Sequence, residues 1–294
     1  MHIAGQLRRA TIMFSQLKKE LAISTNHFVL ADNGDFEKLF HDFIEFNNLI
    51  GMPRHPYTGK PTTFMPYQLE FFNLVDSQKQ QKFHINKSRQ IGVTELILRV
   101  LAYHCFNKYK GGKILIITGT REKTASKLMT RLKQLFRNIP ETVDDHKHVL
   151  KIRLRNGTEI EALPSNSDAI RGDTKIRAIF VDEAAHFDLI DDSTVLDAIQ
   201  PLIFTNKADL FLASTPNGPR GFFYYLLEKG NDYIKCKYDY TCAIGHIYSK
   251  AEIEAELKRI DINVSQEYCC EFTAPSGAIL PPPVIDKMET WDFN

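Results

Sequence analysis

The stretch QKFHINKSRQIGVTELILRVLAYHCFNKY, residues 81–109, joins two kinds of pattern through a short polar segment. QKFHIN (81–86) predicts a strand, and TELILRVLAYHCFNKY (94–109) predicts an apolar helix. A strand that turns sharply into a helix is the local unit from which parallel α/β sheets are built.

The segment between strand and helix resembles a phosphate-binding loop with two deviations. Aligned to the template G-x-x-x-x-G-K-[ST], residues 87–94 read K-S-R-Q-I-G-V-T. Gly92 and Thr94 match, but Lys87 stands at the first glycine position and Val93 at the lysine position. Because both positions lie near the phosphates, Lys87 can replace the lysine absent at Val93. A strand-to-helix turn with a capping role is the alternative interpretation.

The remaining chemistry of such a loop is present. Backbone N–H groups and the helix N-terminus would hold the anion, and the Thr94 hydroxyl would reach Mg²⁺. Arg89 is a second cation within the loop, placed to neutralise charge that develops during phosphoryl transfer.

Outward from this unit the chain alternates strands with helices. Apolar runs predict buried parallel strands, Asn156-Gly157 predicts a hairpin, and periodic segments predict helices. The strands are 113–119, 177–184 and 209–215, the hairpin is 149–163, and the helices are 67–75 and 121–137. We therefore expect an α/β fold with a mostly parallel central sheet flanked by helices.

The pattern divides the chain into four predicted segments. Residues 1–55 are expected to be an N-terminal helical segment and residues 56–220 the core. Residues 221–275, with small helices around the strand YIKCKY, are expected to form a small lid subdomain beside the core. Residues 276–294 form a proline-rich C-terminal tail.

Two carboxylates follow the apolar run AIFV (178–181), at Asp182 and Glu183. Open α/β sheets bind ligands at the carboxyl ends of their strands. Asp182 is placed to hold Mg²⁺ through water, and Glu183 to activate the attacking water as general base. A helix N-cap with acidic first-turn residues is the alternative.

A third strand, LFLAS, ends in small polar residues, namely Ser214, Thr215 and Asn217. Next to the acidic strand end they would face a γ-phosphate and report its presence through their hydrogen bonds. A plain exit from a strand into a turn explains them equally well. His186 stays open between lining the site and a structural role.

The bulk composition is that of an ordinary globular chain of 294 residues, with 43% hydrophobic and 25% charged residues. A net charge of +1 excludes a uniformly basic coat, and no run is apolar enough to span a membrane. Five irregularly spaced cysteines favour reduced thiols over a disulfide framework.

Taken in order, these motifs resemble the ATPase domain of the large terminase subunit, the motor that drives DNA into the capsids of tailed phages. The resemblance covers roughly residues 64 to 275. It is carried by FMPYQLEFF (64–72), KSRQIGVTE (87–95), ILIITGTREKTASKLM (114–129), LPSNSDAIRGDTKIRAIFVDEAAHF (163–187), LASTPNG (212–218) and QEYCCEF (266–272). The family contains loops whose lysine sits at the first position, as at Lys87.

The resemblance implies the fold and the role of each position. The fold is a P-loop NTPase of the RecA-like ASCE class, with ATP and Mg²⁺ as ligands. Catalytic roles fall on Glu183, Arg89 and Arg171, the last acting on a neighbouring subunit's ATP or serving as a structural ion pair. Metal binding falls on Thr94 and Asp182, coupling on Ser214, Thr215 and Asn217. ATP binding falls on Tyr67 and Gln68, which would read adenine, and on Lys87, Ser88, Arg89, Gln90, Gly92, Val93 and Thr94.

The resemblance also implies ATP hydrolysis that powers translocation of double-stranded viral DNA into a preformed capsid. The implied partners are that DNA, the viral portal and the small terminase subunit, without a membrane. The implied state is a homo-oligomeric ring when assembled, with a monomer as the alternative in isolation. The implied location is the cytoplasm of the infected host cell, docked on the capsid portal. Large terminases carry a nuclease domain after the ATPase, and we expect no nuclease activity from residues 1–294.

Two other functions fit parts of the sequence. A nucleic-acid helicase of the related class needs a second RecA-like domain, for which the residues after 220 leave no room. A nucleotide-binding assembly subunit that does not hydrolyse ATP is supported by the departure at Val93.

Overall fold

The computed structural model describes residues 28–30, 36–38, 42–76, 79–119, 122–145, 147–164, 170, 174–187, 189–228 and 230–273. The chain divides into two compact units, Met1–His41 and Asp42–Asn294. In the first, β1 (Phe28–Leu30) pairs antiparallel with β2 (Phe36–Lys38).

At these two short strands the structure differs from the predicted N-terminal helical segment over 1–55, while residues 1–27 lie outside the described residues. The dipeptide Asn33-Gly34 separates the two strands in the sequence, and Asn-Gly is a strong hairpin signal. The helical spacing of Phe36 with later apolar residues was therefore misleading, whereas α2 (Phe43–Ile50) in the second unit is helical as predicted.

An eight-stranded sheet forms the centre of the second unit, in the order β10-β3-β9-β8-β4-β7-β6-β5. Neighbours from β10 to β7 are parallel, and β7, β6 and β5 pair antiparallel. The strands are β3 (Lys82–Lys87), β4 (Lys113–Thr118), β5 (Val143–Asp145), β6 (Lys151–Leu154), β7 (Glu159–Pro164), β8 (Ile176–Asp182), β9 (Asp209–Ser214) and β10 (Ile234–Tyr238).

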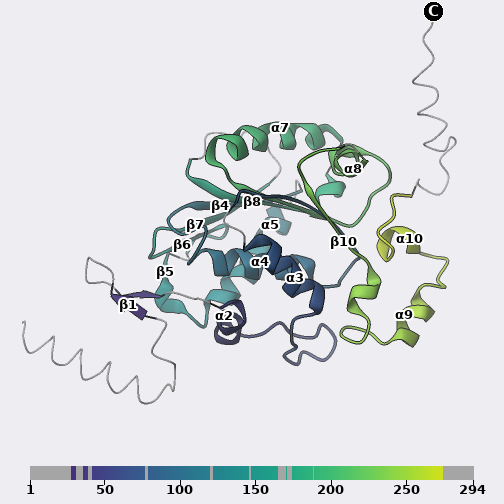
Figure 1. Ribbon diagram of the computed structural model, residues 1–294, viewed down its shortest axis with the longest axis horizontal. Coiled ribbons are helices and arrows are strands. Elements are labelled where there is room, and N and C mark those ends of the chain that lie inside the picture. Colours follow the sequence, from purple (N-terminus) through teal and green to yellow (C-terminus); the bar gives the residue numbers. More distant parts are fainter. Residues whose placement is uncertain are drawn as a thin grey trace, which may run out of the picture. The chain divides into compact units, whose positions relative to one another are not determined.

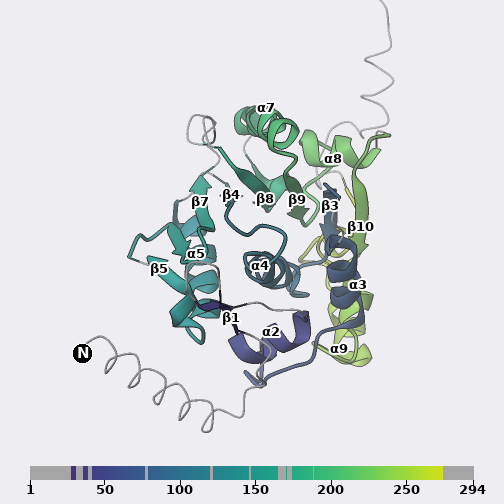
Figure 2. The same ribbon diagram turned by 60° about the vertical axis from the view of Figure 1, so that its left-hand side comes forward.

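Helices cover both faces of this sheet (Figures 1 and 2). α7 (Leu189–Asn206) and α8 (Gly221–Glu228) lie on one face, and α4 (Val93–His104) lies on the other with α2 and α3 (Pro66–Val75). α5 (Glu122–Phe136) packs against α4 and β7. The short helices α9 (Lys250–Glu256) and α10 (Val264–Glu267) follow β10.

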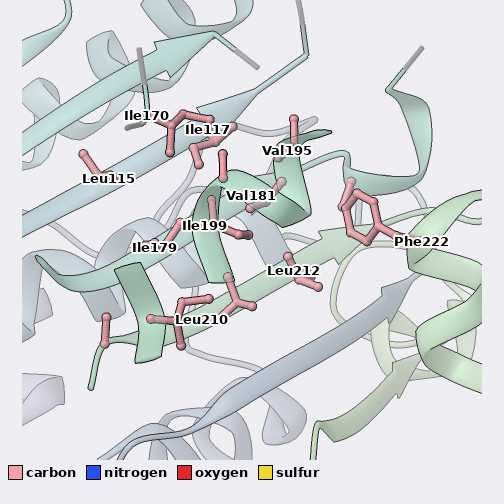
Figure 3. Packing of buried hydrophobic residues seen from close by; sticks show 14 of the residues in the cluster. Leu115, Ile117, Ile170, Ile179, Val181, Val195, Ile199, Leu210, Leu212 and Phe222 are labelled. Atoms are coloured by element: carbon pink, nitrogen blue, oxygen red, sulfur yellow. The ribbon is translucent and has the colours of Figure 1, made fainter. Parts of the chain in front are cut away.

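Apolar side chains of the strands meet those of α7 and α8 in one buried cluster (Figure 3). Burying one such side chain contributes about 1.5–3 kcal/mol, so this contact holds the helices firmly on the sheet. Its members include Leu115, Ile117, Ile179, Val181, Leu210 and Leu212 from the strands, Val195 and Ile199 from α7, and Phe222 from α8.

The sequence predictions of an α/β fold, of the buried strands and of the 149–163 hairpin are confirmed. β6 and β7 flank Asn156-Gly157, and Gly157 has the positive φ of 83° that this turn requires. β9 lies between β3 and β8.

The structure differs from the predicted lid in one element. β10 comes from the 221–275 segment, yet it pairs in parallel with β3 and so belongs to the main sheet. β10 alternates between exposed and buried positions. Such a pattern fits both a strand of a small subdomain and the edge strand of a large sheet, so the sequence alone did not assign β10 to the main sheet. The other predicted boundaries stay predictions.

The five cysteines are free thiols, as predicted. In the part of the chain that the structure describes, no helix combines the length and the apolar character needed to cross a membrane.

Candidate nucleotide-binding site

The predicted site residues lie at the carboxyl ends of three adjacent strands. The register pairs Asn86 of β3 with Ser214 of β9, and Ala213 of β9 with Asp182 of β8. Residues that follow these positions therefore meet at one edge of the sheet, where ligands bind in open α/β folds.

The loop between β3 and α4 turns through two residues with positive φ, Gln90 at 61° and Gly92 at 92°. A Cβ atom at Gly92 would lie 3.3 Å from the amide nitrogen of Gln68, so the position favours glycine both by conformation and by space. The Tyr67 hydroxyl donates to the Ile91 carbonyl at 2.6 Å and fixes the loop from outside.

Lys87 brings the ammonium group into the site. Its side chain is buried, and its Nζ donates to Oε1 of Glu183 at 3.0 Å. Val93, at the usual lysine position, is 2% exposed and packs in the core. The geometry therefore agrees with the prediction that Lys87 takes the role that a lysine at position 93 has in the usual loop.

Thr94 and Asp182 form a hydrogen bond between α4 and β8. The Thr94 hydroxyl donates to Oδ1 of Asp182 at 3.1 Å. Burial and, to a smaller extent, the charge of the adjacent Glu183 raise the pKa of Asp182, whereas Lys87, Thr94 and Arg131 lower it, and the net pKa is about 6. Asp182 is therefore ionised at neutral pH but close to its titration range.

Glu183 begins a tight turn directly after β8 and has a φ of 53°. Burial raises the pKa of this carboxyl, but the opposing charge and hydrogen bond of Lys87 help to bring the net pKa below its ordinary value. Ser214 lies within 3.4 Å of the second carboxylate oxygen, and the Thr215 backbone N–H also bonds to the carboxylate. Glu183 is thus an ionised carboxylate held by Lys87 at the end of β3 and by Ser214 and Thr215 at the end of β9.

The predicted coupling residues contact the turn after β8. The Ala185 N–H donates to the Ser214 hydroxyl at 3.1 Å, and the Asn217 amide donates to the Ala185 carbonyl at 3.0 Å. Ser214 and Thr215 are buried, so these bonds are shielded from water.

With this geometry established, the relatives of the chain can be compared. Residues 84–285 match the family described as terminase large subunit, T4likevirus-type, N-terminal. The chain belongs to the large terminase family.

Solved structures of other large terminases share the fold of this terminase chain. The ATPase domain of the Thermus phage P74-26 large terminase is 19% identical with a TM-score of 0.58, over 78% of this chain and 98% of that domain. The bacteriophage HK97 large terminase is 15% identical with a TM-score of 0.57, over 77% and 54%. A large terminase from a thermophilic bacteriophage, solved in complex with ADP, is 15% identical with a TM-score of 0.52, over 71% and 54%.

These overlaps show which part of a large terminase the chain represents. It spans nearly the whole of the isolated P74-26 ATPase domain and about half of the HK97 protein and of the terminase solved with ADP. At identities below 20% the likeness shows the fold, and the roles of single residues rest on the geometry of this chain.

The terminase phosphate loop is tied to α10, a contact that sequence reasoning missed. The Arg89 N–H and the Ser88 hydroxyl donate to the Glu267 carbonyl at 2.9 and 3.1 Å. Nε of Arg89 forms an ion pair with the Glu267 carboxylate at 2.8 Å. Arg89 thus faces Glu267 in this structure, while Gln90 is exposed to solvent.

The predicted adenine-reading residues lie beside the loop in α3, and both are buried. Oε1 of Gln68 accepts from the Met65 N–H at 2.9 Å, and the Gln68 amide also bonds to the Tyr67 hydroxyl. The Tyr67 ring lies 4.7 Å from that of Tyr238 in β10. The structure thus surrounds this position with aromatic groups, and the base contact stays a prediction.

Arg171 lies outside the described residues, so its predicted action on a neighbouring subunit's ATP stays a prediction. The other predicted residues all lie in the phosphate loop, at its flanking elements or at the ends of β8 and β9.

Proposed function

We propose that this terminase chain is a Mg²⁺-dependent ATPase that powers translocation of double-stranded viral DNA into a preformed capsid. The observation that carries the proposal is the convergence of Lys87, Thr94, Asp182 and Glu183 at one sheet edge. One cation, one hydroxyl and two carboxylates beside a helix N-terminus are the parts that phosphoryl transfer requires.

The residues at the end of β8 suit a magnesium ion. Mg²⁺ prefers oxygen ligands and usually takes one or two carboxylates together with phosphate oxygens and water. The Thr94 hydroxyl and the buried Asp182 carboxylate provide such oxygens 3.1 Å apart. When bound, the ion would neutralise charge on the phosphates.

The chain's own groups would act on the nucleotide as follows. The Lys87 ammonium exchanges its bond to Glu183 for a phosphate oxygen, and the backbone N–H groups before α4 hold the phosphates. Glu183, released from that bond, accepts a proton from the attacking water. Ser214 and Thr215 bond to Glu183, so their hydrogen bonds would change when Glu183 loses its bond to Lys87.

The same proposal covers the assembly in which the work is done. The chain would act in a homo-oligomeric ring on the portal, with the small terminase subunit and duplex DNA, in the cytoplasm of the infected host cell. Arg171 would act on the ATP of the neighbouring subunit. Family membership supports these assignments.

Replacing Glu183 with Gln tests the proposal. The change removes the proton acceptor but keeps the shape of the side chain, so ATP binding should persist while phosphate release falls by about 100-fold or more. Binding is measured by calorimetry with ATP, and turnover by phosphate release. Glu161→Gln is the matched control, because Glu161 lies in β7 and pairs with Lys113 away from the site. Normal turnover in Glu183→Gln contradicts the proposal.

A further inference from the structure

One nitrogen of the His186 ring lies between two functional groups from different strands. Nε2 of His186 is 2.9 Å from the Thr215 hydroxyl and 3.9 Å from Oε2 of Glu183. The 3-10 turn η2 (Ala184–His186) creates this placement, since the His186 N–H donates to the Glu183 carbonyl at 2.9 Å. The ring is thereby directed back over the carboxylate.

The two loops that His186 connects are already joined by hydrogen bonds between the main chain of Ala185 and the side chains of Ser214 and Asn217. The His186 ring is therefore not needed to bring the loops together. What it adds is a link between two side chains, the Thr215 hydroxyl and the Glu183 carboxylate.

The environment makes this link sensitive to the state of Glu183. Thr215 is 1% exposed, so its hydroxyl depends on protein partners rather than on water. Burial lowers the pKa of His186, and the positive charges of Lys87 and Arg89 lower it further. The negative charges of Glu183 and Glu267 raise this pKa, but the net shift is downward. A neutral ring at pH 7 accepts or donates one hydrogen bond at Nε2 without neutralising the carboxylate beside it.

We propose that His186 is a positioning residue that holds the Thr215 hydroxyl and the Glu183 carboxylate in one arrangement. A change at Glu183 during hydrolysis then reaches the loop after β9 through the ring. This inference rests on the proposed function, because it assigns the coupling between the hydrolytic carboxylate and the segment that moves.

Three substitutions test the assignment by steady-state kinetics. His186→Ala should lower kcat about tenfold and leave KM for ATP within about twofold, as expected when a supporting partner of a catalytic group is lost. His186→Gln, whose amide reaches the place of Nε2, should restore most of kcat. Thr215→Val should lower kcat like His186→Ala, and the double variant should be no worse than either single variant.

The outcomes separate a positioning role from packing. A kcat equal to wild type in His186→Ala overturns the assignment, while the loss of turnover in Glu183→Gln still supports the proposed function. Equal losses in the Ala and Gln variants, with a raised KM and a lowered melting temperature, also overturn it, because they indicate packing alone.

A measurement that needs no turnover covers the case in which the wild type does not hydrolyse ATP and the proposed function itself fails. The NMR signal of the His186 ring is identified by its absence in His186→Gln. Its titration midpoint should move to lower pH in Glu183→Gln, because the lost carboxylate no longer stabilises the charged ring. An unchanged midpoint would show that ring and carboxylate do not interact, which overturns the proposal.

Discussion

Lys87 is the residue that we propose takes the place of the lysine absent from the phosphate loop. It lies at the end of β3, is 6% exposed and reaches the site through its contact with Glu183. Comparison with the loop template identified Lys87 as a substitute, but it could not show that the partner of Lys87 is Glu183, the predicted general base. That contact joins residues 96 positions apart, which only the sheet order brings together.

Exchanging the lysine between positions tests this replacement. Lys87→Ala should weaken ATP binding by about tenfold or more, since a charge-assisted contact to phosphate is lost. Adding Val93→Lys should not restore binding, because Val93 is packed in the core and a lysine there would bury an unpaired charge. Titration calorimetry measures both variants. Recovery of binding in the double variant would show that the ordinary position is still usable.

The raised pKa of Asp182 predicts a pH-dependent stability. Because the folded-state pKa of about 6 lies above the ordinary value of 3.8, folding favours the protonated carboxyl. That stabilisation is fully present below the ordinary value and is lost as the pH rises through about 6. Ionised Asp182 therefore destabilises the fold at higher pH.

Asp182→Asn should raise the free energy of unfolding by about 1–3 kcal/mol near pH 8 and change it little near pH 4. Urea unfolding at both pH values measures the difference. Asp144→Asn is the control, because Asp144 is exposed and its substitution should have little effect at either pH. A gain at pH 4 as large as that at pH 8 would contradict the assignment.

At the scale of elements, the loop before α4 depends on the left-handed conformation of Gly92. Gly92→Ala should cost about 1–3 kcal/mol of stability and also weaken ATP binding, because its Cβ would press on Gln68 beside the phosphates. Gly59→Ala is a matched control, since Gly59 also has a positive φ but no atom near its Cβ. Unfolding and binding curves for both should show similar destabilisation and a binding defect in Gly92→Ala alone.

Elements with a single strong pattern were predictable from the sequence. The buried strands β4, β8 and β9 are apolar runs, and Gly157 marks the β6–β7 hairpin. Sequence reasoning missed α7, whose apolar residues are not confined to one face and which contains Pro201, a residue that usually ends a helix. It also missed the short strand β5, which is only three residues long.

Contacts between distant elements were not predictable. The loop residue Ser88 and Glu267 of α10 are 179 positions apart, and no local pattern connects them. The same holds for β10, whose place beside β3 depends on the sheet order and not on its own sequence. Sequence thus predicts which residues meet at the edge of the sheet better than it predicts the contacts that hold them there.

At the scale of the whole molecule, the second unit contains the sheet, the phosphate loop and both carboxylates, and the structural match of the chain covers 98% of an isolated terminase ATPase domain. A motor function requires that hydrolysis in this unit moves DNA. In the proposed mechanism, the contacts of Ser214 and Thr215 with the turn after β8 carry that transfer.

The most direct test of this account is the amount of duplex DNA that becomes resistant to nuclease when the protein is supplied with ATP and empty capsids that carry a portal. The account predicts that protected DNA accumulates with time for the wild type and is absent for Glu183→Gln, although that variant still binds ATP. Equal protection by the wild type and Glu183→Gln would show that hydrolysis at this site does not drive the DNA.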